Sequence, residues 1–410
     1  MPADARAAVV LIEVNDPIGA GFVRVSPCQR PGSTVDVSWQ NDRSVGISYV
    51  GVTTGPLCLQ HLGEAGVRVT LLGHLSVEGP DPTRLPPTLT TPLTPVRLPG
   101  LRALSPVRLV DTRSGLGVAA TRPLGAGETF ELPIAQAAAS TTAVALNVTV
   151  TEPEATGFLS VFPCDQNRPK ASNLNYVAGE TVPNLVNVKV SVTRSVCLFA
   201  QQSTHLIVDL AGTYEAGGGA GAQPVAPVRL LDTRTPIGVP AIAKVADGEV
   251  LVLQVAGRGG VPSSGASAVM MNVTATETGG EGYVTVYPCD RARPTASNLN
   301  DERARTVPNL VSVRLSTAGT VCLFSQRATH LVADLAAWYS VDEDDGFREV
   351  VPDRLLDTRE AIGAPAAKIA AGTVLTLRVR APQQRCTRPG LTTDTRDPPG
   401  IPRRAVHLGP

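Results

Sequence analysis

The sequence predicts an all-β protein made of tandem antiparallel β-sandwich modules, jelly-roll or Ig-like, with one disulfide per module. Three observations support this fold class. A long segment recurs along the chain, apolar residues alternate within its short runs, and cysteines recur at a constant spacing. A β-trefoil or a barrel stays open as an alternative.

The repeat is evident from motifs that return in the same order. The first full copy contains PVRLVDTR (106–113), GFLSVFPC (157–164), ASNLNY (171–176), TVPNLV (181–186) and VCLF (196–199). The second contains PVRLLDTR (227–234), GYVTVYPC (282–289), ASNLND (296–301), TVPNLV (306–311) and VCLF (321–324). Each copy is long enough to bury a core of its own.

The runs within a copy have the period of strands. Val144, Leu146 and Val148 fall on one face, and turn-rich clusters such as 152–157 separate one run from the next. Apolar residues on both faces of some runs indicate strands that are buried on both sides. The sequence contains no sustained 3.6-residue apolar stripe.

The chain divides into full and partial copies of the repeat. In order, we predict a degenerate back half of a unit (1–80), a Pro/Thr-rich linker (81–105), a full unit (106–216), a Gly/Ala linker (217–226), a full unit (227–340), an acidic linker (341–351), the front part of a unit (352–381) and a disordered tail that a frameshift would explain (382–410). As a rival, the two partial copies together complete a third unit and close a ring, as propellers do. The start in mid-unit suggests a misannotated start, and the chain lacks the pattern of a signal peptide.

The cysteines form a pattern of pairs. Cys164 and Cys197 have the same spacing as Cys289 and Cys322, and Cys28 and Cys58 occupy nearly corresponding places in the degenerate unit. We predict three disulfides, Cys28–Cys58, Cys164–Cys197 and Cys289–Cys322, and an oxidising compartment. Cys386 is left over.

Composition and motifs exclude several classes of function. A formal net charge of +0 argues against a nucleic-acid binder or a polybasic membrane-surface protein. No apolar run is long enough for a membrane span. We find no catalytic motif, metal-ligand cluster or cofactor-binding pattern, and therefore predict no enzyme activity, metal or cofactor.

The order of these motifs resembles a repeat module of exported and surface-anchored actinobacterial proteins that has no assigned function. The resemblance covers 106–340 fully and 8–79 and 352–381 in part. It implies β structure and an extracellular or cell-surface location, and it brings no catalytic residues.

Recurring polar residues are the candidate site. The predicted ligand-binding residues, with the one aromatic worth testing, are Asn173, Asn175, Asp209, Asn298, Asn300, Asp334 and Trp338. Asparagine amides can bind sugar hydroxyls, but they also satisfy loop backbone at strand ends. We interpret the aspartates of the three DTR motifs as structural partners of their arginines.

Two functions follow as expectations. The first is a non-enzymatic extracellular repeat protein, a structural spacer or adhesion-like surface component. The second is a carbohydrate- or cell-wall-binding module that accompanies a secreted hydrolase. Polar side chains in an exposed groove favour the second function, and side chains turned onto the backbone favour the first.

Overall fold

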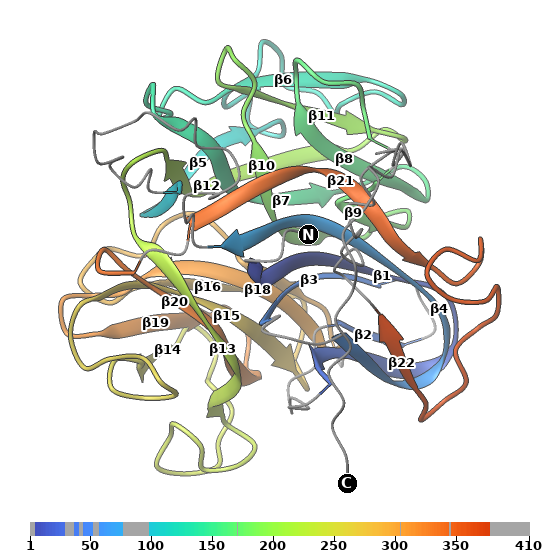
Figure 1. The fold of residues 1–410 in the computed structure, drawn as a ribbon. Helices are drawn as coiled ribbons and strands as arrows, with labels where there is room; N and C mark the ends of the chain where they lie inside the picture. Colours follow the sequence, from blue (N-terminus) through green and yellow to red (C-terminus); the bar gives the residue numbers. More distant parts are fainter. Residues whose placement is uncertain are drawn as a thin grey trace, which may run out of the picture. The chain divides into compact units, whose positions relative to one another are not determined.

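The structure is a computed structural model that describes residues 5–28, 37–40, 44–51, 57–76 and 98–377, except residues 170, 304, 344 and 345. Within these ranges every regular element is a β-strand (Figure 1). The all-β part of the prediction is therefore confirmed. The tail 382–410 lies outside the described residues.

The second and third units are copies of each other. The second unit contains β5 (Gly100–Asp111), β6 (Thr129–Pro133), β7 (Thr141–Thr151), β8 (Gly157–Pro163), β9 (Leu174–Tyr176), β10 (Val182–Lys189), β11 (Ser195–Ala200) and β12 (His205–Glu215). The third contains β13 (Gly221–Asp232), β14 (Val250–Gln254), β15 (Ala266–Thr276), β16 (Gly282–Pro288), β17 (Leu299–Asp301), β18 (Val307–Arg314), β19 (Thr320–Ser325) and β20 (His330–Ser340). Each unit forms two four-stranded antiparallel sheets, in the orders β10-β7-β12-β5 and β6-β11-β8-β9 for the second and β13-β20-β15-β18 and β14-β19-β16-β17 for the third.

Both ends of the chain build the first unit. It contains β1 (Ala5–Pro27), β2 (Val37–Gln40), β3 (Ser44–Gly51), β4 (Leu57–Ser76), β21 (Gly346–Asp357) and β22 (Val374–Leu377). Strand β21 (orange in Figure 1) pairs with one end of β4 (blue), and β22 pairs with its other end. The rival prediction, in which the two partial copies complete one unit, is therefore correct.

These elements form a six-bladed β-propeller of small antiparallel sheets. The second and third units contribute two sheets each, and in the first unit the long strands β1 and β4 connect β2, β3, β21 and β22 into one six-stranded sheet. The strand order within a blade is not sequential, because the chain passes between the two sheets of a unit several times; β8 and β9, and likewise β16 and β17, are consecutive strands of one sheet.

The prediction of tandem antiparallel β-sandwich modules, jelly-roll or Ig-like, is wrong. The two sheets of one unit do enclose an apolar core, as Val148 of β7 and Leu198 of β11 illustrate. The units are not strung in series, however, because β21 completes the unit that β1 begins. One apolar cluster also joins all three units through residues such as Leu11, Tyr214 and Tyr339.

Strand β7 illustrates why these strands are buried on both faces. Val144, Leu146 and Val148 point into the core of the second unit. Ala143 and Ala145, on the other face, belong to the cluster shared by the three units. This face bears small and polar side chains, and it lies against neighbouring units instead of water.

The predicted linkers are wrong at their downstream ends. Residues 100–105, 221–226 and 346–351 belong to β5, β13 and β21. Proline and glycine suggested extended connections, but these strands lie at sheet edges, where proline is tolerated. Without a neighbour on that side, β12 and β20 would each have an unpaired edge. β5 pairs with this edge of β12, and β13 pairs with that of β20.

Candidate functional site

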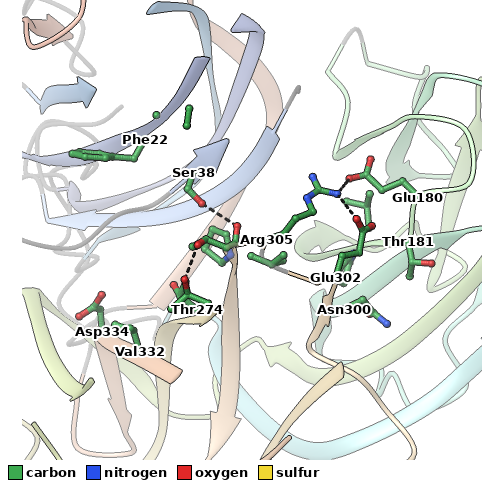
Figure 2. A pocket seen from close by; sticks show the side chains of 18 of the residues that line it. Phe22, Ser38, Glu180, Thr181, Thr274, Asn300, Glu302, Arg305, Val332 and Asp334 are labelled. Atoms are coloured by element: carbon green, nitrogen blue, oxygen red, sulfur yellow. Dashed lines mark hydrogen bonds and ion pairs between the residues drawn. The ribbon is translucent and has the colours of Figure 1, made fainter. Parts of the chain in front are cut away.

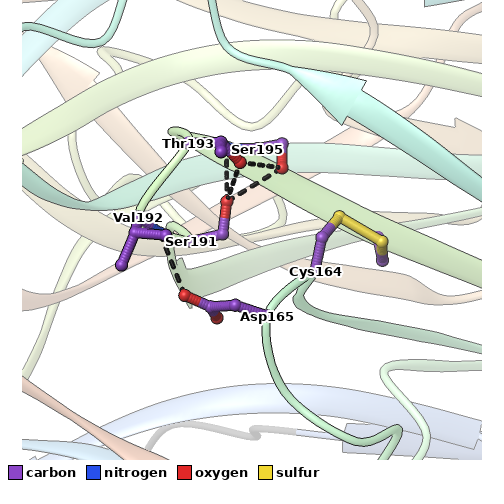
Figure 3. The surroundings of a disulfide bond; sticks show 7 residues. Cys164, Asp165, Ser191, Val192, Thr193 and Ser195 are labelled. Atoms are coloured by element: carbon purple, nitrogen blue, oxygen red, sulfur yellow. Dashed lines mark hydrogen bonds between the residues drawn. A yellow bond between two sulfur atoms is a disulfide. The ribbon is translucent and has the colours of Figure 1, made fainter.

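The three predicted disulfides are present as Cys28–Cys58, Cys164–Cys197 and Cys289–Cys322. Strands β8 and β11 pair beside Cys164–Cys197, and the bridge closes the segment that carries ASNLNY. Beside this bridge, a carboxylate oxygen of Asp165 accepts a hydrogen bond of 2.9 Å from the N–H of Val192 (Figure 3). Closing a loop with a sequence separation of 33 stabilises the fold by roughly 3–4 kcal/mol in the chain-entropy view. Cys386 lies outside the described residues.

The DTR motifs form closed Asp–Arg turns. Asp111 accepts hydrogen bonds from the Arg113 N–H at 3.1 Å and from the Arg113 guanidinium at 3.0 and 2.8 Å. The same contacts recur at Asp232 and Asp357. Hydrogen bonding to Arg113 lowers the pKa of Asp111, although burial opposes the shift. The structural interpretation of these aspartates is confirmed.

A second Asp–Arg pair joins neighbouring strands in the second and third units. Arg108 of β5 contacts both oxygens of Asp209 of β12 at 2.8 and 3.1 Å. Arg229 contacts Asp334 in the same way at 2.9 and 3.1 Å. Burial raises the pKa of both aspartates, and each arginine opposes that shift. These carboxylates therefore have a structural partner, which the sequence analysis did not assign.

Asn173 and Asn298 turn inward. The side-chain oxygen of Asn173 accepts a hydrogen bond of 2.6 Å from a backbone N–H of β8, and that of Asn298 accepts one of 2.7 Å from β16. Their backbone carbonyls accept hydrogen bonds of 2.7 Å from the amides of Asn184 and Asn309. These residues hold the ASNLN segment against its own unit.

The ASNLN segment also contacts the preceding unit. The Asn147 amide donates to the Ser297 carbonyl at 2.6 Å, and the Arg108 guanidinium donates to the Thr295 carbonyl at 3.0 Å. Between the first and second units, the Asn175 amide donates to a carboxylate oxygen of Glu13 at 2.9 Å. The segment therefore fills the space between two units at both junctions.

A pocket of about 420 Å³ lies where residues of all three units meet (Figure 2). Its lining includes, from the first unit, Phe22 and Ser38; from the second, Asn175 and Glu180; and from the third, Arg229, Thr274, Thr276, Asn300, Glu302, Arg305, Val332 and Asp334. Three arginines and three carboxylates line it, together with hydroxyls, amides and apolar side chains.

Ion pairs fix one wall of this pocket. The Arg305 guanidinium contacts carboxylate oxygens of Glu180 at 2.9 Å and Glu302 at 3.1 Å (Figure 2). The Ser38 hydroxyl donates to the Thr306 carbonyl at 3.2 Å. This wall is therefore held by contacts between all three units.

The structure brings together only some of the predicted ligand-binding residues. Asn175, Asn300 and Asp334 line the pocket. Trp338 is half-buried against the core of the third unit, and it is not part of the pocket lining. Asn173, Asn298 and Asp209 are also absent from that lining, because each is buried against partners of the fold.

Sequence reasoning missed most of the pocket. An arginine stands three residues before the DTR aspartate in each of the three copies, as Arg229 does before Asp232. This recurrence could have identified Arg229 as the partner of a recurring carboxylate such as Asp334. Phe22 and Ser38 belong to the degenerate first unit, where the repeat gives no signal. Glu180 and Arg305 each stand directly before TVPNLV and carry opposite charges. This difference between the two copies could have predicted the ion pair that joins their units.

Asp301 is an unusual buried carboxyl beside the pocket. It pairs with Gly282 across β16 and β17, where the second unit pairs Tyr176 with Gly157. Asp301 is 2% exposed, and among the described residues neither carboxylate oxygen has a hydrogen bond of normal geometry. Burial raises the pKa of Asp301 to about 6, which its own N–H and Thr278 offset only in part.

Comparisons with known proteins do not identify a family. No protein-family model and no curated protein matches the chain. A tandem CBM22 domain of Paenibacillus barcinonensis Xyn10C is 11% identical over 59% of this chain and 93% of its own, with a TM-score of 0.17. The cycloalternan-forming enzyme of Listeria monocytogenes is 14% identical over 80% and 29%, with a TM-score of 0.18. The STIV major capsid protein is 8% identical over 59% and 97%, with a TM-score of 0.16. These scores are too low to support a shared fold or function.

Two further features concern membranes and metals. In the part of the chain that the structure describes, no helix is long and apolar enough to cross a bilayer. The same residues contain no group of three or more His, Cys, Asp or Glu side chains arranged to hold a metal ion.

Proposed function

We propose that this chain is a non-enzymatic extracellular protein with a structural, adhesion-like role at a cell surface. The observation that carries the proposal is the way in which the recurring polar residues are used. Asn173 and Asn298 bond backbone within their units, and Arg108 and Arg229 bond buried aspartates. The three disulfides fit an oxidising environment.

The adhesion-like role is preferable to that of a spacer. A spacer works by holding its two ends apart. Here β21, near the end of the described chain, pairs with β4 of the first unit, and Gly346 lies opposite Ser76. Ala5 lies opposite the same Ser76 from the other side, so in the described part of the chain β1 and β21 flank β4 and do not lie at opposite ends of an extended array.

The structural role predicts different effects for two neighbouring asparagines. Asn298→Ala removes a buried acceptor and leaves a β16 N–H unpaired, so the free energy of unfolding should fall by about 1–3 kcal/mol. Asn300 lies in the pocket lining, and Asn300→Ala should change the free energy of unfolding by less than about 1 kcal/mol. Urea unfolding of the oxidised chain measures both values. Equal stability of Asn298→Ala and wild type would contradict the structural role.

The location is tested separately. Fractionation of the producing cells, with detection by an antibody, should recover the protein with the cell wall or in the medium. Recovery in the cytosol with free thiols would contradict the extracellular proposal.

Glycan binding is the second candidate. The observation that favours it is the pocket, which places amides, hydroxyls and the Phe22 ring around one cavity. Co-sedimentation of the oxidised chain with purified cell walls tests this candidate, with Asn300→Ala as the pocket variant and Asn173→Ala as the variant outside it.

A further inference from the structure

The pocket lies at the junction of the first and third units, and the second unit adds lining residues such as Asn175 and Glu180. At the junction of the second and third units, Arg108 donates to the carbonyl of Thr295, the residue before the third unit's ASNLN segment. At the next junction the matching Arg229 lines the pocket, with a side-chain exposure of 26% against 16% for Arg108. The sequence also differs at this junction, since the first unit has STVDVSWQ (33–40) in place of ASNLNY, and the structure describes residues 37–40 of that stretch.

The charges of the lining balance one another. Arg305 is paired with Glu180 and Glu302, and Arg229 is paired with Asp334. A strongly charged ligand would have to break one of these pairs and leave a partly buried charge uncompensated. The lining therefore fits a ligand that is uncharged and rich in hydrogen-bonding groups.

Phe22 supplies an apolar surface for such a ligand. Its ring is half-buried, and the Arg24 guanidinium lies 4.9 Å from the ring centroid. Thr274 and Asn300 are on the third-unit side of the same pocket (Figure 2). A sugar ring has an apolar face and a rim of hydroxyls, which suits an aromatic ring combined with amides and hydroxyls.

We propose that this pocket binds one neutral oligosaccharide per chain, with one or two sugar rings inside the cavity. A volume of about 420 Å³ is in the range of small-molecule sites. We expect one site per chain although the unit recurs three times, because one copy departs from the ASNLN sequence and two copies keep it. The proposal rests on the glycan-binding candidate above, whose ligand class and stoichiometry it specifies, and it is independent of the structural role.

The test is calorimetric titration of the disulfide-bonded full chain with cellobiose, xylobiose, maltose and N,N′-diacetylchitobiose, with digalacturonate as the charged probe. We expect at least one neutral disaccharide to bind with a Kd of about 1 mM or tighter and a stoichiometry of one. Phe22→Ala should weaken that binding at least tenfold, by the loss of the ring surface.

Phe158→Ala is the matched control, because Phe158 holds the position of Phe22 in the second unit and is not part of the pocket lining. It should leave the Kd unchanged. If Phe22→Ala fails to fold, Thr274→Val removes a pocket hydroxyl with little change of shape and should also weaken binding. Absence of binding by all four neutral sugars, two or more sites per chain, binding of digalacturonate alone, or equal loss in Phe158→Ala would overturn the proposal.

Discussion

Asp301 should make the stability of the protein depend on pH. In the unfolded chain an aspartate has its ordinary pKa of 3.8, whereas burial raises the pKa of Asp301 to about 6 in the folded chain. Between these values the folded state binds more protons than the unfolded state, so stability falls as pH rises through this window. Well above pH 6 the Asp301 carboxyl is ionised in both the folded and the unfolded state, and the full cost of burying its charge lowers the stability.

The magnitude follows from the size of the shift. A difference from 3.8 to about 6 corresponds to about 3 kcal/mol, at about 1.4 kcal/mol per pKa unit. Asp301→Asn removes the titration and keeps the size of the side chain. About 0.6 kcal/mol of this effect is already present at pH 4, because an unfolded aspartate is more than half ionised there. The free energy of unfolding of the variant, minus that of the wild type, should therefore increase by about 2.4 kcal/mol between pH 4 and pH 7.

Urea unfolding at pH 4, 5, 6 and 7 measures this difference. Comparing the variant with the wild type cancels the carboxylates with lowered pKa, such as Asp111 and Asp357, whose stabilisation is lost as pH falls. Tyr176→Asp places a carboxyl at the matching position of the second unit and should introduce a similar slope. Parallel stability curves for Asp301→Asn and wild type would refute this reasoning.

Three further predictions concern the fold. Replacing Cys289 and Cys322 with serine should lower the free energy of unfolding by roughly 3–4 kcal/mol, because the bridge closes a loop with a separation of 33; calorimetry checks this, and an unchanged Tm would contradict it. Truncation before β21 removes Leu356 from the core of the first unit, so limited proteolysis should cut residues 5–76 first; protection of that segment would show that the unit is stable without β21. Arg108→Leu leaves Asp209 buried without its partner and should lower the free energy of unfolding by about 3–5 kcal/mol at pH 7. The loss should be smaller at pH 4, where the carboxyl can be protonated, and a loss of stability that is the same at both pH values would contradict the charge argument.

The local structure could be predicted from the sequence because it depends on neighbouring residues. Alternating apolar residues in 144–150 identify β7, and the recurring spacing of Cys164 and Cys197 identifies a disulfide. The arrangement of the units could not be predicted in the same way. Tandem repeats and linkers are equally compatible with a string of domains and with a closed assembly, and the choice depends on β4 finding a partner in β21, far away in the sequence.

The candidate site was predicted only where its residues recur. Asn175, Asn300 and Asp334 were selected by repetition, and they do line the pocket. Asn173 and Asn298 were selected by the same criterion and are structural, because repetition does not distinguish a residue that holds the fold from one that binds a ligand. Burial and hydrogen-bond partners distinguish them, and both are properties of the folded chain.

The junction of the first and third units links these results. Two copies of the repeat keep the ASNLN segment, and in each of them this segment contacts the neighbouring unit. The polar residues at these two junctions therefore hold the units together. Where the segment has diverged, matching polar residues such as Arg229 and Thr274 line a cavity instead. On the proposal above, the candidate binding site lies where one copy departs from the repeat, and the third unit lines it both with matching residues such as Thr274 and with residues of its own such as Arg305. In a repeat protein of this kind, the copy that departs from the pattern is therefore the better place to look for a ligand.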